Sequence, residues 1–97
     1  MVVGAVSLRL HIPGSSSLKD KRRVVKSVVE RLKNRFDLAV AEVDDLDLWQ
    51  VATLGLVTVS NDQAQANEVL NKAVDFVERS YLEAEVLDYQ LELTHML

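Results

Sequence analysis

The chain has 97 residues, a formal net charge of −4 at neutral pH and no cysteine. This length suffices for one hydrophobic core, so we expect a single domain over residues 1–97. The lack of cysteine excludes disulfides, thiolate metal sites and cysteine nucleophiles. No apolar run approaches the roughly 20 residues that span a bilayer, and we expect no membrane partner. The first residues lack the basic segment and cleavage site of a signal peptide, so we expect a cytoplasmic protein.

Residues 2–12 alternate between apolar and polar side chains, which predicts a half-buried β-strand. Arg9 and His11 fall on its polar side, the side expected to face away from the core. Pro13 and Gly14 end the strand, because proline lacks an amide donor and glycine accepts unusual dihedral angles.

A helix is predicted to begin at Ser17, because Ser17 and Asp20 have the spacing of a capping box. The residues after Ser17 carry an apolar stripe at a spacing of about 3.6 residues, which is typical of a helix that packs one side against a core. The stripe consists of Leu18, Val25, Val28, Val29, Leu32 and Phe36.

The remainder of the chain predicts three strands and a second helix. Residues 37–45 and 51–60 read as strands, and the helix runs from an Asp62 cap to about Tyr81. Residues 85–94 alternate as a final strand. We expect its apolar side to comprise Leu87, Tyr89, Leu91 and Leu93.

The order of these elements is βαββαβ, without an internal linker. This order is typical of the ferredoxin-like α+β sandwich, in which two helices cover one face of a four-stranded antiparallel sheet. The sequence therefore predicts that fold, with the second face of the sheet left open.

Positive charge is concentrated in the first predicted helix. Eight of the eleven Lys and Arg residues lie between Lys19 and Arg35, although the chain as a whole is acidic. Projection at about 100° per residue places five cations along one flank of the apolar stripe. They are Lys19, Arg22, Arg23, Lys26 and Lys33. Such a surface suits the phosphates of RNA, although a merely solvated helix face would carry the same pattern.

The predicted sheet does not favour a second mode of RNA binding. RNA-recognition motifs have the same topology and stack bases on aromatic residues of the first and third strands. The strands predicted here over residues 2–12 and 51–60 contain no aromatic residue. We therefore expect any RNA contact to be electrostatic.

The loop before the first helix is a candidate anion site. Ser15 and Ser17 could bind a phosphate together with backbone amides at the helix start, although ordinary turn and capping chemistry explains both residues as well. The loop is not a P-loop, because the Gly-Lys-Ser/Thr ending is absent.

The segment between the second and third strands carries several acidic residues and the single tryptophan, Trp49. The acids could in principle hold Mg²⁺ or Ca²⁺, but their spacing matches no loop motif, so we expect no metal. They are Glu42, Asp44, Asp45 and Asp47. We expect Trp49 to be buried, because tryptophan is highly buried on average; an exposed tryptophan would instead indicate a partner surface.

Two blocks of sequence, His11 to Arg23 and Ala41 to Asp62, resemble the small bacterial YlxP-like family, a domain of unknown function. The resemblance covers nearly the whole chain and implies a ferredoxin-like fold of this length. It implies no catalytic residue and no cofactor. Genes of this family often lie among those for translation initiation and ribosome maturation, so the resemblance points toward RNA or the ribosome.

The sequence supports three hypotheses about function. The first is a non-enzymatic cytoplasmic protein that contacts RNA or the ribosome through the basic helix. The alternative is a homodimer or other homo-oligomer that uses the open sheet face, because the strand over residues 51–60 is apolar on both sides. The third is a phosphoryl-handling enzyme like acylphosphatase with Arg22 and Asn61, but the glycine-rich loop of that family is missing. We expect neither enzymatic activity nor a cofactor.

Overall fold

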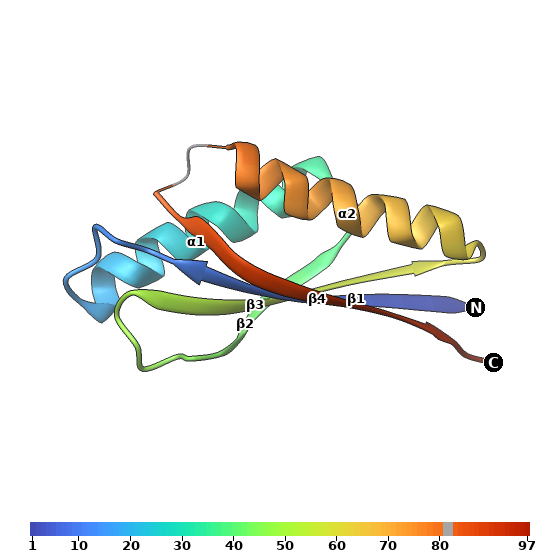
Figure 1. Cartoon of the computed structure of the whole chain (residues 1–97), viewed down its shortest axis with the longest axis horizontal. Helices are drawn as coiled ribbons and strands as arrows, with labels where there is room; N and C mark the ends of the chain where they lie inside the picture. Colours follow the sequence, from blue (N-terminus) through green and yellow to red (C-terminus); the bar gives the residue numbers. More distant parts are fainter. Residues whose placement is uncertain (81–82) are drawn as a thin grey trace.

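A computed structural model describes residues 1–80 and 83–97. The elements follow the predicted order (Figure 1). Their bounds are β1 (Val2–His11), α1 (Leu18–Arg35), β2 (Ala39–Asp44), β3 (Val51–Ser60), α2 (Gln63–Arg79) and β4 (Glu85–His95). The end predicted for the second helix, Tyr81, lies outside the described residues. Neither helix is long and apolar enough to cross a membrane, as far as the chain is described.

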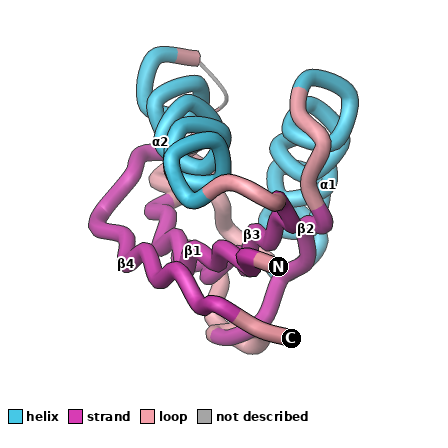
Figure 2. Tube along the Cα trace, turned by 90° about the vertical axis from the view of Figure 1, so that its right-hand side faces the viewer, coloured by secondary structure: helices cyan, strands magenta, loops and turns pink. Residues whose placement is uncertain are grey.

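The four strands form one sheet in the order β2-β3-β1-β4, and each neighbouring pair is antiparallel. Both helices lie on the same face of this sheet, with α1 above the β2 side and α2 above the β1 and β4 side (Figure 2). This arrangement confirms the predicted ferredoxin-like α+β fold.

The core lies between the sheet and the two helices. Alternate residues of the central strands point toward the helices; Leu8 pairs with Leu54, and Val6 pairs with Leu56. All four side chains are almost inaccessible to solvent. Because the period of a strand is two, the neighbours of these residues necessarily face the open side of the sheet.

Side chains cap both helices as the sequence predicts. Ser17 Oγ accepts a hydrogen bond from the amide of Asp20 (3.1 Å), and Asp62 Oδ1 accepts one from the amide of Ala64 (3.2 Å). Amides of the first turn have no partner within a helix, so these bonds fix where α1 and α2 begin.

The predicted alternation of β4 is wrong in the first half of the strand, where Leu87 does not lie on the apolar side. Arg9 pairs with Asp88, but Leu10 pairs with Val86, so Leu87 is the extra residue of a bulge. In a bulge, two residues of one strand lie opposite a single residue of the partner strand. Beyond the bulge, the side chains that would have faced the core therefore face the other way. Val86 therefore packs against the core, and Leu87 is exposed.

Candidate nucleic-acid interface

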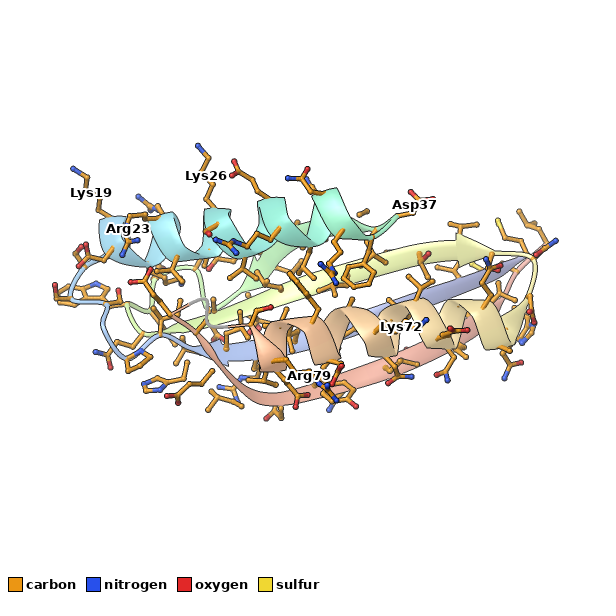
Figure 3. The ribbon with its side chains drawn as sticks, turned by 90° about the horizontal axis from the view of Figure 1, so that it is seen from above. Lys19, Arg23, Lys26, Asp37, Lys72 and Arg79 are labelled. Atoms are coloured by element: carbon orange, nitrogen blue, oxygen red, sulfur yellow. The ribbon has the colours of Figure 1, made fainter. Side chains whose placement is uncertain are left out.

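The five predicted cations all lie on the solvent-exposed surface of α1. Viewed from the helical side, Lys19 and Lys26 point away from α2, whereas Arg23 lies on the side of α1 that faces α2 (Figure 3). The first helix therefore presents cations along the outer edge of the molecule. We call the surface formed by Lys19, Arg22, Arg23, Lys26 and Lys33 the cationic face of α1.

One member of the cationic face has an acidic partner. Arg23 Nη1 donates to Glu83 Oε2 (3.1 Å), and this hydrogen bond together with the carboxylate charge raises the pKa of Arg23. Among the described residues, the other four members form no salt bridge. These four cations are therefore available to an external anion.

The unpaired cations follow the helix axis. Lys19, Lys26 and Lys33 are seven residues apart, so at 3.6 residues per turn they lie almost in line, with a rise of about 10 Å between successive members. Arg22 lies within the same stretch of helix. The arrangement is a track along one side of the molecule and not a pocket that encloses a small anion.

Lys21, in the middle of the basic segment, has a structural position that the sequence reading missed. Its side chain is fully buried, and Nζ lies 2.9 Å from Glu42 Oε2. Nζ also donates to the carbonyl oxygen of Asp45 (2.6 Å) and lies 3.4 Å from that of Leu46. Lys21 thus joins α1 to β2 and to the segment after it.

The signal for this burial is present in the sequence. Val24, Val25 and Val28 follow Lys21 at intervals of three, four and seven residues, so at about 100° per residue Lys21 falls within the apolar stripe and not beside it. A lysine at the centre of a buried helix face requires an internal acidic partner, which Glu42 supplies.

The loop before α1 is held by its own hydrogen bonds. Ser15 is buried and its hydroxyl donates to the carbonyl of Ser17 (3.0 Å), while Ser17 Oγ caps the helix. The amide and hydroxyl of Ser16 both donate to Asp20 Oδ2 (3.2 and 2.9 Å). The carboxylate of Asp20 therefore occupies a position where a phosphate would accept these bonds, and anion binding by Ser15 and Ser17 stays a prediction.

The acidic residues of the second hairpin serve separate internal contacts. Glu42 pairs with Lys21, and Asp45 Oδ2 accepts from the hydroxyl of Thr53 (2.6 Å). Asp45 has a positive φ of 59°, in the left-handed region that aspartate tolerates better than most residues. Within the described part of the chain, no three His, Cys, Asp or Glu side chains converge in a way that could hold a metal ion.

The expectation that Trp49 is buried is wrong. Trp49 is 56% exposed and lines a shallow groove of about 560 Å³. Two hydrogen bonds hold the segment that carries Trp49. Lys21 Nζ donates to the carbonyl of Asp45, and the side chain of Gln50 donates to the carbonyl of Ser15 (3.0 Å). These polar bonds, rather than an inserted indole ring, fasten this end of the molecule. The groove is lined by Ser15, Ser16, Leu48, Trp49, Gln50 and Val51.

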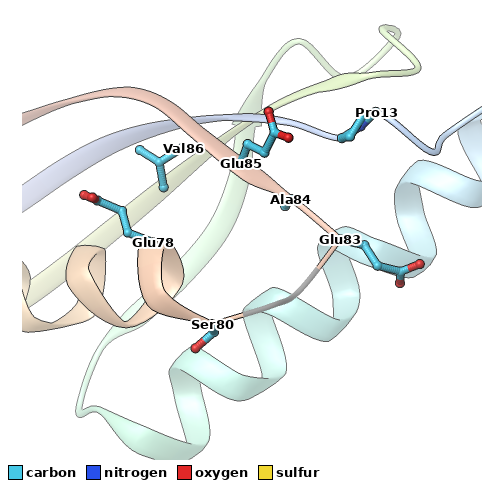
Figure 4. Close-up of a pocket in the computed structure, with 7 residues that line it drawn as sticks. All are labelled: Pro13, Glu78, Ser80, Glu83, Ala84, Glu85 and Val86. Carbon is cyan, nitrogen blue, oxygen red and sulfur yellow. The ribbon is translucent and has the colours of Figure 1, made fainter.

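A second hollow, of about 360 Å³, lies between the end of α2 and the start of β4. Three glutamates line it, and their carboxylates point in different directions (Figure 4). The acidic lining repels a phosphate, and the divergent carboxylates do not form a common cation site. Its described lining residues are Pro13, Glu78, Ser80, Glu83, Ala84, Glu85 and Val86.

The two histidines do not share a site. His11 Nδ1 lies 3.6 Å from Glu85 Oε2, and His95 Nε2 lies 2.9 Å from Gln63 Oε1 at the start of α2. They occupy opposite ends of β1 and its partner β4, because His11 pairs with Glu85 and His95 with Val2. The structure therefore brings no pair of imidazoles together.

On the open face of the sheet, the surface over β2 and β3 is apolar, whereas the surface over β4 is polar. Val43, Val57 and Val59 are exposed on β2 and β3, whereas Asp88 and Glu92 are exposed on β4. No aromatic side chain occurs on β1 or β3, so a base-stacking platform of the RNA-recognition type is absent there.

Comparison with known proteins agrees with the resemblance noted in the sequence. A family model described as a protein of unknown function (DUF503) matches residues 3–91. The chain is also 30% identical over 77 residues to the uncharacterized protein YlxP of Bacillus subtilis (strain 168), an alignment that covers 79% of this chain and 84% of YlxP. The chain therefore belongs to the DUF503 family, whose function is unknown.

Proposed function

We propose that the protein binds RNA, on its own or within the ribosome, through the cationic face of α1. One observation carries this proposal: four exposed cations without an acidic partner among the described residues lie along one helix of a chain whose net charge is −4. Segregated charge of this kind attracts an anion of matching length, which a uniform mixture of charges would not do.

The binding mode that fits this surface is contact with the phosphate backbone. Lys and Arg neutralise phosphates and release condensed counterions, which gives affinity without sequence preference. The cations form a track, and the open sheet face offers no aromatic residue on its central strands. The proposed role is therefore binding and positioning rather than catalysis.

Fluorescence anisotropy of labelled single-stranded fragments of bacterial ribosomal RNA, measured over a salt series, tests the proposal. If five phosphates are contacted, the logarithm of the binding constant should fall against the logarithm of the salt concentration with a slope of about −3.5. No binding even at low salt would contradict direct contact with these RNAs.

The structure indicates which substitutions isolate the interface. Lys19→Gln/Lys26→Gln/Lys33→Gln removes three unpaired charges and should make the slope shallower by about 2 units, at about 0.7 per lost contact. The matched control is Lys72→Gln/Arg79→Gln on α2, where both cations pair with acids one turn away. An unchanged slope in the α1 variant, or an equal loss in the control, would refute the assignment to α1.

A second candidate is self-association through the open sheet face. Val59 is 63% exposed and Val43 56% exposed on adjacent strands of that face. Covering such side chains with a second copy would remove apolar surface from water.

A further inference from the structure

We propose that Trp49 stacks against a base of single-stranded RNA whose backbone follows the cationic face of α1. This inference rests on the proposed function and specifies its ligand as a single strand, because the bases of a duplex are already stacked on one another. It gives a role to the exposed indole ring of Trp49, which does not pack in the core.

The groove of Trp49 lies against the start of α1. Ser16 lines this groove, and its amide and hydroxyl both bond to Asp20 in the first turn of the helix. Lys19 immediately precedes Asp20 and is exposed. The segments at residues 12–17 and 45–50 also lie at the same end of the molecule (Figure 1). The cations of α1 therefore lead from the groove along the helix.

An aromatic surface beside a cationic track is the combination that single-stranded nucleic acid requires. Proteins of this kind hold the backbone with Lys and Arg and stack bases on aromatic rings, largely without regard to sequence. Trp49 supplies an aromatic face that is 56% exposed, and Lys19 begins the track. The groove is shallow and leaves the ring accessible, as stacking requires.

Charge complementarity favours RNA over an apolar protein segment as the occupant. A protein partner would use Trp49 together with the exposed leucines Leu46 and Leu48, and would gain nothing from the adjacent cations. Asp45, an acid near the groove, has its carboxylate turned to Thr53 and Arg9, with contacts of 2.6 and 4.0 Å. Asp45 is therefore paired, whereas Asp47, two residues before Trp49, is exposed and forms no salt bridge among the described residues; the attraction for a phosphate comes from the cations of α1.

Trp49 is the single tryptophan of the chain, so its fluorescence reports on this position alone. We would titrate the full chain with an oligouridine and an oligoadenosine of about 12 nucleotides and with an RNA duplex of similar length. Single strands should quench the emission of Trp49. Trp49→Leu should weaken their binding by about 5- to 150-fold, the equivalent of one stacked base, and should leave duplex affinity unchanged.

Two further variants separate stacking from other roles. Trp49→Phe keeps an aromatic plane and should retain most of the affinity, whereas Trp49→Leu keeps apolar bulk alone. Tyr89→Leu removes an exposed aromatic ring on β4, at the edge of the sheet opposite β2, and should have no effect on binding. Far-ultraviolet circular dichroism and urea unfolding would verify that each variant is folded.

The outcomes distinguish the two proposals. RNA binding that depends on Lys19, Lys26 and Lys33 but neither quenches Trp49 nor responds to Trp49→Leu would overturn the stacking inference and leave the proposed function standing. No RNA binding by the intact protein would overturn both. Self-association abolished by Trp49→Leu, without quenching by RNA, would assign the groove to a protein contact and also overturn the inference.

Discussion

At the scale of single residues, the buried Lys21 connects α1 to β2 and to the segment that follows β2. Its ammonium group is fully buried and pairs with Glu42 while also donating to the Asp45 carbonyl. Lys21→Met would leave a shielded carboxylate and a carbonyl without a donor. Breaking a buried pair in this way costs about 3–5 kcal/mol, so we expect the free energy of unfolding in urea to fall by that amount.

A matched double variant tests the cause of this loss. Lys21→Met/Glu42→Leu removes the unpaired carboxylate as well as the lysine, and apolar replacement of both partners of a buried pair is often close to neutral. We expect the double variant to be more stable than Lys21→Met. A double variant as unstable as the single one would show that the carbonyl bonds of Lys21, and not its charge pair, stabilise the fold.

The carboxylate of Asp20 makes the free energy of unfolding depend on pH. The side chain and amide of Ser16 donate to its carboxylate and lower the pKa of Asp20 below its ordinary value of 3.8. A carboxylate with a lowered pKa stabilises the fold fully above its unfolded pKa, and this contribution is lost as the pH falls through the folded value.

Asp20→Asn keeps an oxygen acceptor at the same position but does not titrate. We expect urea unfolding to show the wild type as the more stable protein at neutral pH. The difference should shrink as the pH falls below about 4. A difference that stays constant down to about pH 2.5 would contradict the assigned role of the ionised carboxylate.

At the scale of elements, α2 packs closely on β1 at Gly4. A Cβ atom at this position would lie 2.7 Å from Leu70 Cδ1 and 3.1 Å from Leu93 Cδ2, both of them in the core region. Gly4→Ala should therefore lower the free energy of unfolding by about 1–3 kcal/mol, the usual cost of overpacking.

Gly14 provides the control for this substitution. A Cβ atom there would meet nothing within 4 Å, and its φ is not positive. Gly14→Ala should be neutral or stabilising by up to about 1 kcal/mol, because alanine restricts the unfolded chain. Equal effects at the two positions in urea unfolding would contradict a close approach of α2 to β1.

At the scale of the whole molecule, the cationic face of α1 and the apolar part of the sheet lie on different sides, because both helices cover the face opposite the open one (Figure 2). The two candidate functions can therefore be separated by mutation. Self-association through the sheet predicts that the mass measured by sedimentation rises with protein concentration and that Val57→Lys/Val59→Lys abolishes the rise.

The same variant should leave the salt dependence of RNA binding by α1 unchanged, apart from a small gain from the added charges. A mass that stays monomeric at all concentrations would remove the sheet-face candidate. A loss of RNA binding in this variant would instead place the RNA on the sheet face.

Local patterns in the sequence specify the elements, their order and the cationic face of α1. Alternation at period two gave β1 and β3, the spacing of Ser17 and Asp20 gave the start of α1, and projection of the helix placed Lys19 and its neighbours outside. These are properties of local geometry, which depends on neighbours in the chain. The βαββαβ order then leaves few topologies, and the ferredoxin-like sandwich is the observed one.

The ion-pair partner of Lys21, the bulge at Leu87 and the exposure of Trp49 become apparent only in the folded chain. Each depends on groups that are distant in the sequence: Lys21 pairs with Glu42 of β2, and Leu87 is the extra residue where β4 pairs with β1. Trp49 is exposed on a loop that hydrogen bonds of Lys21 and Gln50 hold in place. Pairing across the fold, and not the pattern along the chain, supplies the energy that selects these states.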